Sequence, residues 1–365
     1  MSPARRPRAK RERPRDALAA LRKRCGRVSG RREASRFPCE RDPLRTAPRV
    51  RWIADLDGRD LLSVGRVTPL GLLVTSIQRT LVLDVDTGRV RCVLPKGTPV
   101  PADEVILLAS GATMSVFDPW NGAALHRFGI RGNSPYAVPL FRDGRLLIEL
   151  GYAEVVSYRF DDVRRPPAVE WRSRFVSSPH LSGFTRDLVI VSFDAGLAGK
   201  SPWAVGLRVT DGSELLRVKK IEASCAEGDL VLGHDQRDLI GLDEDGRPRW
   251  KVPGLHDPFA VTASHVLCIQ SGQERLLVID RATGVVTPLE LPFTIDGWLH
   301  RSCAASDDVV VCANGDRLEG VDLAGRSLWS WRAPDGAKVG APRLLPGRVY
   351  AQLGARQVVC LEEEP

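Results

Sequence analysis

Two acidic clusters are the first candidates for chemistry, because closely spaced carboxylates can hold Ca²⁺. The first cluster is Asp55, Asp57 and Asp60, and the second is Asp243 and Asp245. Neither cluster has the alternating acidic spacing, followed by a Glu, that defines a calcium-binding loop. Asp is also common in tight turns, where its side chain accepts backbone hydrogen bonds. We therefore predict no metal site at either cluster.

The other residue types that perform catalysis are scattered along the chain. The six His show neither H-x-x-x-H nor HExxH spacing, which would place two imidazoles on one helix face. No Ser lies in the G-x-S-x-G context of a nucleophile elbow. The eight Cys form no CxxC pair, so we expect neither a zinc site nor a disulfide framework. The sequence therefore predicts no catalytic residue.

The N-terminal segment carries most of the positive charge. Residues 1–49 contain 17 Lys and Arg against five Asp and Glu, whereas residues 50–365 carry a small net negative charge. Because residues 1–49 contain few aromatic or β-branched residues, we expect them to form a disordered tail. Residues 50–365 are expected to form one folded domain. Three explanations of this tail are open. It is a solvated segment, it results from a start codon assigned too early, or it binds nucleic acid or an anionic surface. The predicted polyanion contacts are Arg5, Arg6, Arg8, Lys10, Arg11, Arg22, Lys23 and Arg24.

Short strands that recur about every forty residues must position any site. The clearest copy is Leu81–Cys92, in which a strand leads into a turn and a second strand. In the turn, Asp84 and Thr87 can accept backbone hydrogen bonds, and Gly88 supplies a positive φ angle. The recurring turn residues are Asp84, Thr87, Gly88, Asp118, Gly122, Gly212, Asp243, Gly246, Asp280, Thr283, Gly284, Asp322 and Gly325.

A period near forty residues is typical of a propeller or a solenoid. Trp stands four residues after the turn glycine at Trp250 and Trp329, where its ring could lie between neighbouring units. The last strand, residues 357–362, lacks a partner, and residues 50–56, with Trp52, supply one. We predict an all-β propeller of four-stranded antiparallel blades, closed by this N-terminal strand. Eight blades fit the length, with seven as the alternative, and the blade-docking residues are Trp52, Trp250 and Trp329.

The repeat resembles the A-x-D-x-x-T-G-x-x-x-W motif of the quinoprotein-like (PQQ-repeat) β-propellers. The turns at Asp84 and Asp280 match its left part, and Gly246–Trp250 and Gly325–Trp329 match its right part. The chain is thus similar to a divergent member of this family and, in length, to its non-enzymatic BamB-type scaffolds. The resemblance implies PQQ with calcium as an alternative, but the short loops lead us to expect no cofactor.

We expect a monomeric, non-enzymatic scaffold that binds a protein partner, because every recurring residue has a structural role. One alternative is a quinone-dependent dehydrogenase or another small-ligand-binding propeller. Another alternative is a propeller tethered to nucleic acid through residues 1–49. The longest apolar run near the N-terminus is Ala17–Leu21, too short for a signal peptide or a membrane span, so we expect a cytoplasmic location.

Overall fold

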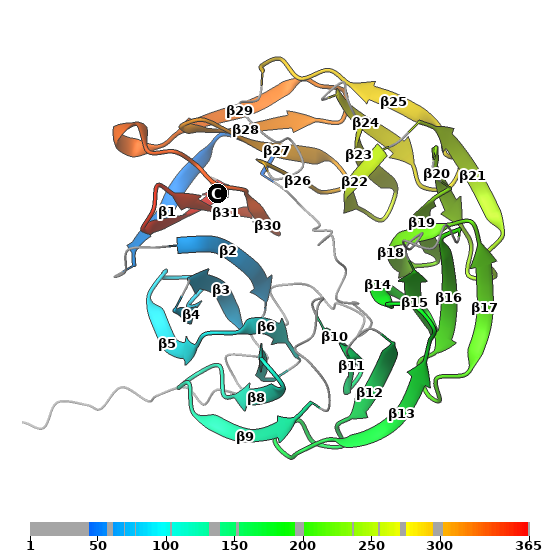
Figure 1. Ribbon diagram of the computed structural model, residues 1–365. Helices are drawn as coiled ribbons and strands as arrows, with labels where there is room; N and C mark the ends of the chain where they lie inside the picture. Colours follow the sequence, from blue (N-terminus) through cyan, green and yellow to red (C-terminus); the bar gives the residue numbers. More distant parts are fainter. Residues whose placement is uncertain are drawn as a thin grey trace, which may run out of the picture. The chain divides into compact units, whose positions relative to one another are not determined.

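The computed structural model describes most of the chain from residue 44 onwards. Within the compact unit of residues 33–365, strands dominate and pair into antiparallel sheets. The sheets follow one another around a common centre in Figure 1, and in the closing sheet β30 is the innermost strand and β1 the outermost. The described residues are 44–56, 61–68, 70–76, 78–102, 104–130, 139–150, 153–193, 201–235, 237–254, 256–270, 275–294 and 302–363.

The first half of the chain forms four quartets of strands in sequence order. The first contains β2 (Leu61–Thr68), β3 (Gly71–Ser76), β4 (Arg79–Leu83) and β5 (Val90–Pro95). The second contains β6 (Thr98–Pro101), β7 (Ile106–Ser110), β8 (Thr113–Phe117) and β9 (Ala124–Gly129). The third and fourth contain β10 (Leu140–Arg142), β11 (Arg145–Leu150), β12 (Glu154–Arg159), β13 (Ala168–Arg174), β14 (His180–Thr185), β15 (Leu188–Phe193), β16 (Trp203–Arg208) and β17 (Glu214–Lys219).

The second half repeats this order. The next quartet contains β18 (Glu222–Gly228), β19 (Leu230–His234), β20 (Asp238–Leu242) and β21 (Pro248–Pro253). It is followed by β22 (His256–Val261), β23 (His265–Gln270), β24 (Arg275–Asp280) and β25 (Val286–Leu289), then by β26 (Cys303–Ala305), β27 (Val309–Asn314), β28 (Arg317–Asp322) and β29 (Ser327–Arg332). After the short 3-10 turn η1 (Pro334–Gly336) come β30 (Arg343–Leu345), β31 (Arg348–Leu353) and β32 (Gln357–Glu363).

Two quartets share one hydrogen-bonded sheet, because β14 pairs in parallel with β18. Gly183 of β14 makes this close approach feasible, since a Cβ atom there would lie 2.3 Å from the Ala226 carbonyl oxygen. The fold is therefore the all-β propeller that the sequence predicts, built from four-stranded antiparallel units. The number of eight blades stays a prediction.

The last sheet is closed by the N-terminal strand. Strand β1 (Pro48–Asp55) pairs antiparallel with β32, so that the spatial order is β1, β32, β31, β30. The register places Trp52 opposite Cys360, and a β-bulge lies between Val50 and Trp52. The β4–β5 pair has a bulge at the equivalent place, where Cys92 pairs with Val82. The predicted closure by residues near 50–56 is confirmed, and β1 behaves as the fourth strand of a repeat.

The hydrophobic core lies between the sheets rather than within one of them. Each described cluster of buried residues draws on two neighbouring quartets. One cluster, for example, joins Val309 and Trp329 of one sheet to Val349 and Leu361 of the next. Apolar faces of adjacent sheets thus bury each other, which is the main source of stability in such an arrangement.

The folded part begins earlier than the boundary at residue 50 that the sequence suggests. Leu44 is fully buried in the cluster around Trp329. Glu363 accepts hydrogen bonds from the Arg45 backbone N–H and the Thr46 hydroxyl, both at 3.2 Å. Residues 44–47 therefore belong to the closing sheet, and they take the place of the covalent turn that connects the third and fourth strands elsewhere.

Shortening the side chain of Leu44 tests this boundary. We expect Leu44→Ala to lower the free energy of unfolding by about 2–4 kcal/mol, because it leaves a cavity against Trp329. The matched control, Leu215→Ala, removes an exposed side chain on β17 and should change stability by about 0.5 kcal/mol or less. Urea denaturation measures both values, and equal effects of the two substitutions would contradict the assignment.

Candidate functional site

The turns between the third and fourth strands share one hydrogen-bond pattern. Asp84 Oδ1 accepts bonds from the Asp86 N–H at 3.0 Å, the Thr87 N–H at 2.9 Å and the Thr87 hydroxyl at 3.0 Å. The Gly88 N–H donates to the Asp84 carbonyl oxygen at 2.8 Å, and Gly88 has a φ of 69°. The pattern recurs in full at Asp280, Thr283 and Gly284 and with fewer side-chain hydrogen bonds at Asp118 and Gly122. The turn is one residue shorter at Asp243 and Gly246 and at Asp322 and Gly325, and Arg208 holds the Asp place before Gly212.

Each such turn lies beneath a side chain from the preceding sheet. The Trp52 ring covers Gly88 so closely that a Cβ atom there would lie 2.5 Å from the ring. The Trp52 indole N–H also donates to the Val85 carbonyl oxygen at 3.2 Å. Trp250 does the same over Gly284 and donates to the Arg281 carbonyl oxygen at 2.9 Å. At these two places a single Trp joins one sheet to the next through ring packing and a hydrogen bond.

Three further residues make this docking contact, although the sequence analysis did not predict them as docking residues. Trp171 covers Gly212 and donates to the Val209 carbonyl oxygen at 2.9 Å. The sequence did not single out Trp171, because the insert before it breaks the repeat spacing. His126 Nε2 lies 3.1 Å from the Val163 carbonyl oxygen, and the Cys92 thiol lies 3.5 Å from that of Pro119. Residues other than Trp can therefore make this contact, and Leu216 on β17 packs on Gly246 without donating a hydrogen bond.

At the closure, the same contact crosses from the last complete quartet to the N-terminal segment. The Trp329 indole N–H donates to the Leu44 carbonyl oxygen at 2.8 Å. Glu362 lies opposite Arg49 in the β1–β32 register, as Asp84 lies opposite Arg89 in the first turn. Glu362 therefore holds the Asp place of the repeat.

Arginine side chains link the closing sheet to the first turn. Arg51 binds Glu362 with one nitrogen and donates to the Asp86 carbonyl oxygen with another at 3.0 Å. From β31, Arg348 donates to the Asp86 carboxylate at 2.8 Å. Burial opposes ionisation of Glu362, but hydrogen bonds from Arg51 and Arg49 outweigh it and hold the pKa of Glu362 below its usual value. Burial also raises the pKa of Cys360, behind this network, to about 12.

The carboxylates of the second acidic cluster are engaged in its own turn. Asp243 Oδ1 accepts the backbone N–H groups of Asp245 and Arg247, and Asp245 pairs with Arg247 at 3.2 Å. Among the residues that the structure describes, no three His, Cys, Asp or Glu side chains gather to hold a metal ion. PQQ with calcium stays an alternative, and we derive no step through such a group. Asp57 and Asp60 lie outside the described residues.

The predicted polyanion contacts cannot be placed. Arg5, Arg6, Arg8, Lys10, Arg11, Arg22, Lys23 and Arg24 all precede residue 44 and lie outside the described residues. Binding of nucleic acid or an anionic surface by this segment stays a prediction. In the part of the chain from residue 44 that is described, no helical segment is long and apolar enough to cross a membrane.

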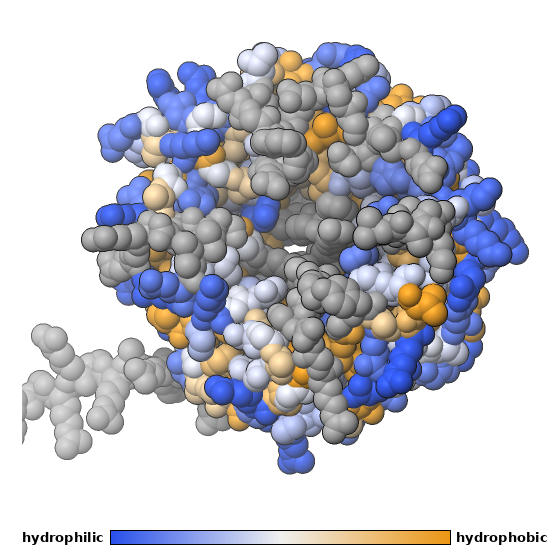
Figure 2. Space-filling model, in the orientation of Figure 1, coloured by the Kyte–Doolittle hydropathy of each residue, from blue (hydrophilic) through white to orange (hydrophobic). Residues whose placement is uncertain are grey.

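The outermost strands β1 and β5 differ from those of most other quartets. On the face shown in Figure 2, hydrophilic residues surround scattered apolar ones. Both strands expose an apolar side chain two positions before and one position after the docking residue. On β5 these are Val90 and Val93, 43% and 51% exposed, and on β1 they are Val50 and Ile53, 42% and 39% exposed. The position after the docking residue holds Arg127, Arg172, Arg217, Lys251 and Ser330 on β9, β13, β17, β21 and β29.

We call the four exposed residues Val50, Ile53, Val90 and Val93 the β1–β5 face. The two strands belong to neighbouring sheets, because Trp52 of β1 rests on the turn that precedes β5. Each is an outermost strand, so one edge carries N–H and C=O groups that no other strand pairs. Exposed basic side chains border the face at Arg49, Arg89 and Lys96, and β5 contains no acidic residue. Each of the two strands therefore exposes an apolar pair, has basic side chains nearby and is open to strand pairing.

Comparison with solved structures shows the class of fold, a β-propeller. The chain is similar to BamB from Moraxella catarrhalis, with a TM-score of 0.58 and 11% identity over 87% of this chain and 100% of that one. It is also similar to the quinohemoprotein alcohol dehydrogenase ADHIIG from Pseudomonas putida HK5, with a TM-score of 0.59 and 10% identity over 90% of this chain and 78% of that one. The C-terminal WD40 domain of Sif2 gives 0.56 and 10% over 88% and 99%. No family model and no curated protein sequence matches the chain.

These likenesses agree with the resemblance read from the repeat motif. At about one residue in ten identical, they show the propeller fold alone and do not assign an activity. The expectations of no cofactor and of a monomer stay predictions.

A glycine substitution tests the docking contact. We expect Gly88→Ala to lower the free energy of unfolding by about 2–4 kcal/mol, because the new Cβ strains the positive φ and collides with the Trp52 ring. Gly111→Ala is the matched control. Its φ of 55° is also positive, but nothing lies within 4 Å of its Cβ position, so about 1 kcal/mol is expected. Thermal or urea denaturation that gives equal losses would argue against docking through Gly88.

The closure carboxylate predicts a pH dependence. Because the pKa of Glu362 is lowered in the folded state, its contribution is fully present above the ordinary Glu pKa of about 4.3 and is lost as the pH falls through the folded value. We expect Glu362→Gln to cost about 1 kcal/mol at pH 7 and progressively less below pH 4. Urea denaturation across this range measures the difference, and a cost that does not shrink on acidification would contradict the assignment.

Proposed function

We propose that this protein is a non-enzymatic scaffold whose β1–β5 face binds a partner protein. The observation that carries the proposal is the departure of two neighbouring outer strands from the polar pattern of β9, β13, β17, β21 and β29. Where the repeat places Arg, Lys or Ser in those strands, β1 and β5 carry Ile53 and Val93. Exposed apolar residues inside a polar border are typical of protein interaction sites.

The chemistry of the face specifies the partner. An extended segment can add a strand to the open edge of β5, with its backbone groups satisfying those of the edge. Its alternate side chains would be apolar, to pack against Val90 and Val93. The intervening side chains would be acidic, to pair with Arg89 and Lys96. The fold comparison is compatible with this proposal, since the likeness to BamB spans all of that chain.

Site-specific photo-crosslinking tests the proposal. A photoreactive amino acid is placed at Val93, or at the control position Leu215, which is exposed on an outer strand of another quartet. We expect one discrete protein adduct from position 93 and none from position 215 in the cells that express the protein. Excess unlabelled protein should suppress the adduct, and the Ile53→Asp/Val93→Asp variant should fail to do so, because its new carboxylates repel an acidic partner.

Other outcomes would contradict the proposed scaffold function. Identical adducts from positions 93 and 215 would show that the β1–β5 face is not selective. Turnover of an alcohol or sugar by the purified protein with added quinone and Ca²⁺ would instead support the dehydrogenase alternative. The cytoplasmic location and the nucleic-acid tether through residues 1–49 remain proposals that this experiment does not address.

A further inference from the structure

Cys303 and Cys312 lie directly opposite each other on neighbouring antiparallel strands. Cys303 is the first residue of β26, the innermost strand of its sheet, and Cys312 lies on β27. Their Sγ atoms are 3.0 Å apart, closer than an ordinary non-bonded contact. Residues opposite each other in an antiparallel pair have Cα atoms about 4.5–5.5 Å apart, which falls within the range that a disulfide spans. The backbone thus needs little movement to join the two sulfurs.

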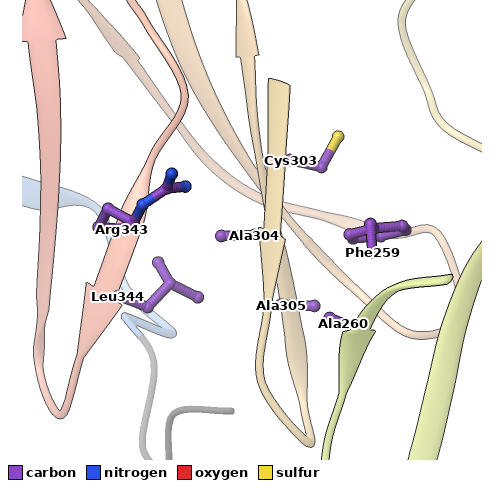
Figure 3. A pocket seen from close by; sticks show the side chains of 7 residues that line it. All are labelled: Phe259, Ala260, Cys303, Ala304, Ala305, Arg343 and Leu344. Carbon is purple, nitrogen blue, oxygen red and sulfur yellow. The ribbon is translucent and has the colours of Figure 1, made fainter. Parts of the chain in front are cut away.

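The two thiols differ in their access to solvent. Cys312 is fully buried, and its contact with Cys303 together with burial raises the pKa of the Cys312 thiol well above its usual value. Cys303 is 7% exposed and lines a cavity of about 40 Å³. Figure 3 shows Cys303 on the side of β26 that faces Phe259 of β22, with Arg343 of β30 on the other side. An oxidant would therefore meet Cys303 first.

The cavity beside Cys303 suits a small oxidant. A volume of about 40 Å³ holds about two or three water molecules, and hydrogen peroxide is about as large as two waters. Its walls include Ala260 of β22, Ala304 and Ala305 of β26 and Leu344 of β30, and Arg343 is the one charged side chain in the described lining. Larger oxidants, such as glutathione disulfide, do not fit.

We propose that Cys303 and Cys312 form a reversible disulfide when a peroxide enters this cavity. The Cys303 sulfur attacks one peroxide oxygen, the O–O bond breaks, and the products are a sulfenic acid on Cys303 and one water. The Cys312 sulfur then displaces the hydroxyl group of the sulfenic acid, an S–S bond forms, and a second water leaves with the Cys312 proton. Two thiols are oxidised and one peroxide is reduced.

The disulfide would covalently link β26, the innermost strand of this sheet, to β27. Strand β26 has only three residues and pairs with β27 through Cys303, Ala304 and Ala305. A bond between its first residue and β27 holds it in register and closes a short loop through the turn at Ser306. The inference does not rest on the proposed scaffold function, because β26 and the β1–β5 face belong to different sheets.

Mass spectrometry of the full-length chain tests the proposal. The protein, with Cys25→Ser and Cys39→Ser to remove the tail thiols, is treated with hydrogen peroxide, alkylated under denaturing conditions and digested with trypsin. Both cysteines then lie in one peptide, Ser302–Arg317. We expect this peptide to become lighter by two hydrogen atoms and to take up no alkyl group, and dithiothreitol to restore two alkylation sites. The melting temperature should rise by about 3 °C or more on oxidation and return on reduction.

Single substitutions distinguish disulfide formation between Cys303 and Cys312 from non-specific oxidation of cysteines. In Cys312→Ser, the sulfenic acid on Cys303 should persist and react with dimedone, whereas in Cys303→Ser neither product should form. Cys92→Ser is the control, because Cys92 is buried in another sheet, and it should leave the cross-link unchanged. Two alkyl groups on Ser302–Arg317 after peroxide would overturn the proposal. So would sulfinic or sulfonic acid on Cys303 with Cys312 still reduced.

Discussion

The structure depends on one repeated contact, in which a side chain on an outer strand packs on the turn of the next sheet and, at most positions, lies within hydrogen-bond distance of a turn carbonyl oxygen. Trp52, Trp171 and Trp250 each place a ring on a turn glycine and an indole N–H on a turn carbonyl oxygen. The carbonyl oxygen is a buried acceptor, so leaving it unpaired would cost free energy. Because the contact always runs from one sheet to the following one, its repetition fixes the order of the sheets and the packing of the apolar faces between them.

At the ends of the chain the docking contact forms without a covalent turn between the third and fourth strands. Leu44 supplies the carbonyl oxygen for Trp329, Glu362 takes the place of the turn Asp, and Arg51 takes the place of Arg91, which pairs with Asp84 in the first turn. Strand β1 is therefore held by main-chain pairing to β32, by a docking Trp and by an arginine network. The same strand carries half of the β1–β5 face, so the position where the chain closes is also where its surface departs from the repeat.

The sequence predicted the parts of this account that rest on local chemistry. The turns at Asp84 and Asp280 need particular residue types at fixed spacing, and the unpaired last strand indicated the closure. It did not predict Trp171, because an insert shifts that residue out of the repeat, or Leu44, because a single Leu in a basic segment gives no pattern. The Cys303–Cys312 pair and the β1–β5 face depend on strand register and exposure, which residue spacing alone does not show.

The central claim is that β1 is an integral fourth strand of the closing sheet and not an attached tail. Native-state hydrogen exchange of the full-length chain tests this claim most directly, because it measures the opening of each strand separately. The account predicts that the amides of β1 that bond to β32 exchange as slowly as those of β31, through unfolding of the whole domain. Exchange of the β1 amides through a local opening, while β31 and β32 stay protected, would contradict it.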